Sequence, residues 1–367
     1  MRLKLESRAA PSAVMRYGSP LVALALTAVI GSLLFLYLGH SPLAAFQALF
    51  VTPVSSLGGL GELALKASPL MLIATGLTVG FRANIWNIGA EGQLVMGAIA
   101  GGGLAVLFHG AQGVWLLPAM MLAGAVGGAL WAAIPAVLRT RFNANEILTS
   151  LMLTYVAQLV LSFLVYGPWR DPDGFNFPQT IMFGQSALFP ILIEGTRFNA
   201  SLFVALAVVG LVWLFMSRSI LGYQMRVAGL SGAAALFAGI DAKRTVWVGM
   251  LAGGVAAGLA GVGEVAGPIG QLLPVVSPGY GFAAIIVAFV GRLHPVGIVL
   301  ASLLMALLYL GGEAAQMSLG LPAAITGLFQ GMLLFILLGT DVFINYRLRV
   351  VRPVLPAPRP AGEGVPA

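Results

Sequence analysis

Few side chains in this sequence could do catalytic chemistry. The three histidines, His40, His109 and His294, lie far apart in the chain and outside any HExxH pattern, so neither metal ligation nor acid–base chemistry is indicated. None of the three lysines follows a glycine, which excludes a phosphate-binding P-loop. The chain has no cysteine and therefore no disulfide or thiolate metal site. We expect no enzyme activity, metal or cofactor in this chain.

Polar side chains gather instead in residues 80–97, which read GFRANIWNIGAEGQLVMG and lie between two apolar stretches. The candidates for binding a small molecule here are Asn84, Asn87, Glu91 and Gln93. If the flanking stretches span a membrane, these groups are costly unless they face a cavity, a partner or the interior of the protein. The alternative is a turn followed by an N-capped helix, which Asn87 and Glu91 would also satisfy.

A second polar segment, residues 261–295, carries Glu264 and Gln271. Its prolines at 268, 274 and 278 prevent one uninterrupted helix. Two interrupted segments, one in each half of a chain, are typical of the substrate pathway in transporters that are built from repeats. We therefore add Glu264 and Gln271 to the pathway candidates.

Composition decides which elements must position these residues. The 367 residues are 59% hydrophobic and only 8% charged, whereas soluble chains average about 25% charged residues. Only a lipid bilayer suits such a surface, and a helix needs about 20 apolar residues to cross it. We predict an all-α, polytopic bundle of about ten spans with interrupted helices. The predicted spans are 18–38, 60–81, 89–108, 114–138, 147–167, 200–217, 245–262, 280–291, 295–314 and 323–343.

The segment 280–291 is too short to cross alone, which predicts a broken or re-entrant helix there. Orientation follows from the basic residues. With ten spans and an inner N-terminus, only Lys66, Arg170 and Arg197 of the 19 lysines and arginines lie outside. Because basic residues concentrate in cytoplasmic loops, both termini are predicted to be cytoplasmic.

This orientation divides the chain into regions. Residues 1–17 form a cytoplasmic N-terminal segment, residues 18–345 the transmembrane domain, and residues 346–367, which are rich in proline, a disordered cytoplasmic tail. An outer loop is predicted at 167–199 and an inner connection at 217–244. The inner connection contains an Ala- and Gly-rich stretch, 229–238, that suits close docking of a short helix against another protein. The alternative is an amphipathic helix that lies on the membrane surface.

Several motifs resemble one family of membrane proteins. They are FRANIWNIGAEGQ (81–93), RFNANEILTSLMLTY (141–155), GLSGAAALFAGID (229–241), and GEVAGPIGQL with SPGYGFAAIIVAFVGRLHP (263–272 and 277–295). They resemble the permease subunits of bacterial ABC importers for nucleosides and related compounds. The wider group includes the ribose and branched-chain amino-acid permeases. The resemblance covers most of the chain, and NIGAEGQ is its most specific element.

The resemblance implies a multi-pass protein of the bacterial cytoplasmic membrane, surrounded by lipid, that carries a small-molecule solute and binds no nucleic acid. Its implied partners are a second permease subunit, commonly homologous but not identical, two cytoplasmic ATPase subunits that bind the ATP and Mg²⁺, and an external substrate-binding lipoprotein. Asn87, Glu91 and Gln93 lie in NIGAEGQ (residues 87–93), the signature element of the family. A nucleoside is the solute that the family implies, although a sugar fits the same polar groups.

The resemblance also implies a helix that couples the permease to its ATPases, at about 230–240. Its candidate contact residues are Leu230, Ser231, Ala234, Ala235, Phe237, Ala238, Gly239 and Ile240. Two other functions stay open at this point. One is an ion-coupled secondary transporter, in which Glu91 or Glu264 would bind the ion. The other is a membrane scaffold whose polar residues only pack.

Overall fold

The computed structural model describes residues 2–8 and 12–351, and it divides into two compact units. One unit comprises residues 1–33 and 331–367, and the other comprises residues 34–330. Over the described residues, nine helices are long and apolar enough to cross a membrane. The predicted all-α, polytopic bundle is therefore confirmed.

The unit of residues 1–33 and 331–367 joins the two ends of the chain. Strands β1 (Arg2–Ser7) and β2 (Tyr346–Val351) pair antiparallel. Helices α1 (Ala13–Tyr37) and α13 (Ala324–Asn345) start or end in this unit, where the Ser19 hydroxyl donates to Asp341 over 2.7 Å.

Strand β2 occupies the first six residues of the predicted tail. Its sequence, YRLRVV, is rich in β-branched, aromatic and alternating apolar residues, which favour a strand. Residues 352–367, the rest of the predicted tail, lie outside the described residues.

The other unit contains the remaining helices. They are α2 (Pro42–Phe46), the π-helical turn η1 (Gln47–Val51), the 3₁₀ turn η2 (Thr52–Val54), α3 (Leu57–Phe81), α4 (Ala90–Leu107), α5 (Leu116–Phe142), α6 (Glu146–Tyr166), the 3₁₀ turn η3 (Gln185–Ala187), α7 (Ser201–Arg218), α8 (Ile220–Leu230), α9 (Gly232–Phe237), α10 (Ala242–Glu264), the π-helical turn η4 (Val265–Ile269), α11 (Tyr280–Val290) and α12 (Pro295–Leu319). Side-chain oxygens of Ser56, Asn145 and Asp241 cap the first turns of α3, α6 and α10. The run 42–54 was not predicted as helix, since it is short and interrupted by proline.

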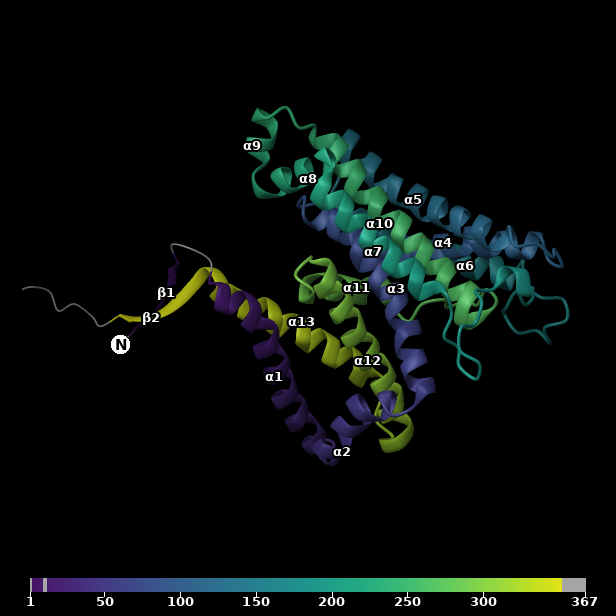
Figure 1. The fold of residues 1–367 in the computed structure, drawn as a ribbon, viewed down its shortest axis with the longest axis horizontal. Coiled ribbons are helices and arrows are strands. Elements are labelled where there is room, and N and C mark those ends of the chain that lie inside the picture. Colours follow the sequence, from purple (N-terminus) through teal and green to yellow (C-terminus); the bar gives the residue numbers. More distant parts are fainter. Residues whose placement is uncertain (1, 9–11, 352–367) are drawn as a thin grey trace, which may run out of the picture. The chain divides into compact units, whose positions relative to one another are not determined.

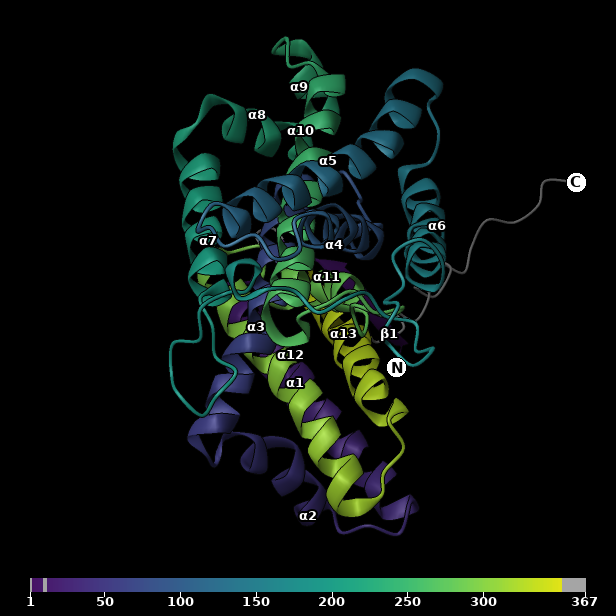
Figure 2. The same ribbon diagram turned by 90° about the vertical axis from the view of Figure 1, so that its right-hand side faces the viewer.

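Helix α10 packs against α3, α4 and α5 (Figures 1 and 2). Glycines allow this close approach. A Cβ on Gly258 of α10 would collide with the backbone of Gly124 and contact that of Gly128, both in α5, and a Cβ on Gly97 of α4 would collide with Gly258. Lipid gives little hydrophobic drive between helices, so small residues that bring backbones together stabilise such bundles.

Helix α11 is the element that the sequence analysis expected to be interrupted. Its 11 residues span about 16 Å, well short of the roughly 30 Å hydrocarbon core. Upstream, α10 ends in η4, where Pro268 lies inside the π-helical turn, and the backbone turns at Gly270 with φ of 75°. Residues 271–279 then lead non-helically into α11.

Candidate functional site

The two interrupted segments meet at Glu91. This residue lies in the first turn of α4, and its Oε2 accepts a hydrogen bond of 2.6 Å from the backbone N–H of Gly281, in the first turn of α11. The Ser277 hydroxyl and the Gly279 N–H are further hydrogen-bond partners of the carboxylate. A carboxylate at a helix N-terminus satisfies free N–H groups and interacts favourably with the helix dipole. Glu91 therefore holds the start of α11 against the start of α4.

Glycine at 281 permits this contact. A Cβ there would overlap the backbone of Glu91. Across the first turn, the Ser277 hydroxyl oxygen accepts from the N–H groups of Gly279 and Tyr280 at 3.1 and 2.9 Å, so the turn is capped from its own chain as well. Any larger residue at 281 would push the two helix starts apart.

Asn87 and Gln93 form a reciprocal amide pair beneath this junction. Asn87 Nδ2 donates to Gln93 Oε1 and Gln93 Nε2 donates to Asn87 Oδ1, both over 2.9 Å. Asn87 Oδ1 also accepts from the Gly89 N–H. Both side chains are about 1% exposed. A buried amide without partners would cost free energy, so this pair stabilises the non-helical backbone before α4.

Helix α6 supports the same backbone from the other side. The Ser150 hydroxyl accepts from the N–H of Ile88 over 3.2 Å, and the backbone and side chains of Ser150 and Thr154 fill the space beside Gly89 and Gly92. The signature element thus combines two functions: its glycines 89 and 92 admit α6, and its polar side chains hydrogen-bond the backbone at the helix break and at the start of α11. The N-capped helix that the sequence left open as an alternative does not describe α4, whose N-cap residue is Gly89 and which has no side-chain cap. Asn87 accepts from the N–H of Gly89, and Glu91 caps a different helix, α11.

A cavity of about 410 Å³ opens beside Glu91. Its polar lining comes from Glu91, from Ser277, and from Tyr155, Gln158 and Ser162 of α6. Tyr155 is 56% exposed and Leu159, also in the lining, 70%, so no other described part of the chain covers this face of α6. The three α6 residues were not among the predicted pathway residues. The available signal was their spacing, i, i+3 and i+7, which puts three polar groups on one face of an apolar span.

The other predicted pathway residues lie elsewhere. Asn84 is exposed in the turn after α3, with φ of 59°, and accepts from the Trp86 indole N–H. Gln271 faces the outer loop, where its Nε2 lies 3.4 Å from Gln179 Oε1. The loop residues Thr180, Phe183 and Phe189 donate backbone hydrogen bonds to residues 266–272, so the loop covers this turn. The structure therefore separates Asn84 and Gln271 from Glu91.

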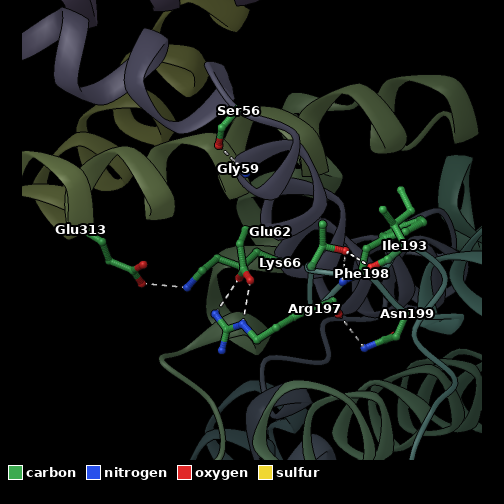
Figure 3. Close-up of polar contacts among 10 residues, drawn as sticks. Ser56, Gly59, Glu62, Lys66, Ile193, Arg197, Phe198, Asn199 and Glu313 are labelled. Carbon is green, nitrogen blue, oxygen red and sulfur yellow. Dashed lines mark hydrogen bonds and ion pairs between the residues drawn. The ribbon is translucent and has the colours of Figure 1, made fainter.

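Glu264, at the end of α10, is buried near a group of charged residues. Arg197 of the loop makes two hydrogen bonds of 2.7 Å to Glu62 of α3, and Lys66, one turn later, bonds to Glu313 of α12 over 2.7 Å (Figure 3). The Glu62 carboxylate raises the pKa of Arg197 through these hydrogen bonds. Both cations also act electrostatically on Glu264. The network ties the loop and α12 to α3.

The predicted coupling segment protrudes from the bundle. Helix α9 lies beyond the ends of α5 and α10 (Figure 2), and the Ser231 hydroxyl caps it by accepting from the Ala234 N–H. Leu230, Leu236 and Phe237 are 88%, 78% and 98% exposed, while Ala235 and Ile240 are buried and anchor the segment. The remaining predicted contact residues, Ala234, Ala238 and Gly239, are exposed.

Comparisons with known proteins place this geometry in a family. The model of the family described as branched-chain amino acid transport system / permease component matches residues 59–338. A glucose ABC transporter permease of Haloferax volcanii is 36% identical over 360 residues, which cover 95% of this chain and 94% of that protein. A nucleoside ABC transporter permease of Lactococcus lactis is 27% identical over 327 residues (86% and 89%), and a guanosine ABC transporter permease of Bacillus subtilis is 28% identical over 336 residues (90% and 94%).

The match covers most of the described helices, from the start of α3 into α13, and includes Glu91, the α6 cavity and α9. The relatives are transport subunits rather than enzymes. The chain therefore belongs to the branched-chain amino acid transport system / permease component family, as a multi-pass ABC transporter permease of the cytoplasmic membrane.

Proposed function

We propose that this chain forms one half of the solute pathway of an ATP-driven importer and that the solute passes through the cavity beside Glu91. The observation that supports this is the meeting of the two interrupted helices at a cavity whose far wall is a polar face of α6. Broken helices at the substrate site are the usual arrangement in membrane transporters. The cavity volume of about 410 Å³ falls within the roughly 300–1,000 Å³ of small-molecule sites.

The proposed solute is neutral and carries a sugar ring, with a nucleoside as the first candidate. Tyr155, Gln158 and Ser162 offer hydroxyl and amide groups, and the single charge in the lining, on Glu91, is already engaged by the N–H groups of α11. Such a lining suits hydroxyl and amide groups better than an ion. The nucleoside and guanosine permeases among the relatives support this candidate. A free hexose is the second candidate, favoured by the 36% identity to a glucose permease.

The Leu230–Ile240 segment is the proposed contact with a cytoplasmic ATPase subunit, on which ATP and Mg²⁺ bind. Leu236 and Phe237 are exposed at the tip of the unit, and the following turn at Gly239, with φ of 71°, fixes their direction. Large apolar side chains exposed in this way mark protein contacts. Closure of two ATPase subunits would then pull α9 and rock the helices that meet at Glu91.

A second permease subunit, homologous and not identical, is proposed to cover the exposed face of α6. This would close the cavity, which the described part of the chain leaves open on that side. An external binding lipoprotein would deliver the solute to the face that carries loop 167–199, with both chain termini in the cytoplasm.

The test is affinity purification of the tagged chain from native membranes in mild detergent, followed by mass spectrometry and reconstitution in vesicles. We expect an ATPase, a second permease and a lipoprotein to follow the chain, and the vesicles to take up labelled nucleoside only with ATP. Uptake of glucose and not of nucleosides would select the second candidate. Recovery of the chain alone, active without ATP, would contradict the importer and support the ion-coupled carrier.

Variants of α6 test the pathway itself. Gln158→Leu and Ser162→Ala should raise the KM of uptake severalfold in the reconstituted importer, since each removes a polar group from the cavity lining. Thr149→Val is the matched control, because Thr149 lies on the same helix, does not line the cavity and bonds to its own helix backbone. Unchanged KM in both cavity variants would remove α6 from the pathway.

A further inference from the structure

A second cavity, of about 200 Å³, shares no residue with the one beside Glu91. It lies between the last turns of α3 and α7, helix α8 and the turn before α12. The residues that matter for its chemistry are Thr75, Arg82, Trp213, Ser217, Arg226 and His294. The proposed pathway and coupling segment do not use it.

The cavity holds two arginines and no carboxylate. Arg82 donates one hydrogen bond, to the backbone oxygen of Leu293, and neither it nor Arg226 has an ion pair among the described residues. Burial and the nearby charge of Arg226 lower the pKa of Arg82. Two close guanidinium groups without a counter-charge create a positive potential that an anion would relieve.

A buried hydroxyl in the wall also lacks a partner. Thr75 is 2% exposed and lines the cavity, and its Oγ1 has no hydrogen bond. The neighbouring Thr78 behaves as helix threonines usually do and donates to the carbonyl of Ala74 over 2.8 Å. A polar group this deeply buried normally has a partner. The unsatisfied hydroxyl of Thr75 therefore points to a polar ligand that the cavity would hold.

The opposite wall is apolar. Val209, Val212 and Trp213 of α7 line it, and Trp213 is 52% exposed on a helix that the other described residues leave mostly uncovered. Ser217, next to the last residue of α7, and Arg82, the first after α3, both line the cavity and put its cationic end at the ends of two candidate spans. Tryptophan and arginine at this depth are typical of the membrane interface. The cavity is therefore cationic toward the headgroup level and apolar toward the hydrocarbon.

We propose that this cavity binds the phosphate group of an anionic phospholipid, with Arg82 and Arg226 on the phosphate and the Trp213 wall along an acyl chain. Basic pockets between transmembrane helices are suited to acidic headgroups. Ser217 and His294 stand at the rim, where they can hydrogen-bond to the glycerol or the headgroup. A lipid fits better than a protein segment, because α7, which carries the apolar wall, is a candidate membrane span with only 22% of its residues buried.

Native mass spectrometry of the purified full chain in detergent tests the proposal, with phosphatidylglycerol and phosphatidylcholine as the titrated probes. The wild type should bind one phosphatidylglycerol at least about fivefold more tightly than phosphatidylcholine, in line with the effect of one arginine near an anionic headgroup. Arg226→Gln should remove that preference. Thr75→Val keeps the side-chain volume and should weaken phosphatidylglycerol binding severalfold. Arg218→Gln, a nearby arginine outside the cavity, should leave it unchanged.

Inorganic phosphate separates a lipid from a free anion. Phosphate at millimolar concentration should not displace phosphatidylglycerol, because it cannot use the Trp213 wall. Displacement by phosphate would overturn the lipid assignment. Equal binding of the two lipids would contradict a site for anionic lipid. So would an equal loss of phosphatidylglycerol binding in Arg226→Gln and Arg218→Gln. The Arg226 side chain is exposed and makes no hydrogen bond within the described residues, whereas that of Arg82 bonds to Leu293, so the Arg226 variant should fold where an Arg82 variant could fail.

Discussion

At the residue scale, the polar groups of the signature element are hydrogen-bonded within the protein. Asn87 pairs with Gln93, and Glu91 caps α11, so three buried polar residues in a bilayer-spanning chain have partners. A buried polar group is costly only when it is unpaired. The signature residues thus hold the helix break in place, and in the proposed pathway the neutral side chains of α6 are the groups that contact the solute.

A double-mutant cycle tests the amide pair. Asn87→Leu and Gln93→Leu should each lower the free energy of unfolding by about 1–3 kcal/mol, since each leaves the other amide buried without a partner. The double variant should lose less than the sum of the two, because both unpaired amides are then gone. The measurement is denaturant unfolding in mixed micelles. Gln185→Leu, on the exposed outer turn η3, is the control and should change stability by less than about 0.5 kcal/mol. Strictly additive losses would argue against the pairing.

At the element scale, glycines determine how closely α10 approaches α4 and α5. Gly258→Ala should lower the free energy of unfolding by about 1–3 kcal/mol, because the new Cβ meets the backbone of α5, which cannot move aside easily. The same substitution at Gly210, within α7, meets no atom within 4 Å and should be neutral or slightly stabilising through helix propensity. The measurement is thermal unfolding of the two variants in detergent. An unchanged stability of Gly258→Ala would show that the helices are not in close contact there.

Helix α9 carries its exposed apolar residues on a short, capped turn, so a single side chain can dominate its contact. Phe237→Ala should reduce the ATPase recovered with the tagged chain by about tenfold or more without lowering the stability of the permease, since Phe237 is 98% exposed. Phe175→Ala on the outer loop, where the side chain is 93% exposed, is the matched control. Equal ATPase recovery with both variants would show that the ATPase subunit binds at another part of the chain.

At the scale of the whole molecule, the distribution of charge predicts an orientation in the membrane with both termini in the cytoplasm. The absence of cysteine allows single cysteines to report it without interference. Gln185 and Lys243 are both exposed, the first in the predicted outer loop and the second in the predicted inner connection, so each is a suitable site for a single cysteine. A membrane-impermeant maleimide should label Gln185→Cys in intact cells and Lys243→Cys only after permeabilisation. The reverse pattern would invert the proposed topology.

The sequence by itself determined the class of the molecule. Long apolar segments form spans wherever the tertiary contacts lie, because each helix satisfies its own backbone hydrogen bonds in lipid. The breaks at 82–89 and 265–279 were equally local, since proline, glycine and clustered polar residues interrupt a helix within a few residues. The short surface helix at α9 was likewise predicted locally, from its small residues and the charges that flank them.

Only the tertiary structure decided which of these features belong together. Glu91 and Gly281 are 190 residues apart in the chain, and their contact depends on how α4, α6 and α11 pack. The same packing brings Tyr155, Gln158 and Ser162 to the cavity and leaves Asn84 and Gln271 outside it. Residues 346–351 gain their strand from a partner at the other end of the chain. Pairings of this kind depend on long-range contacts, to which the local pattern of a single sequence does not respond.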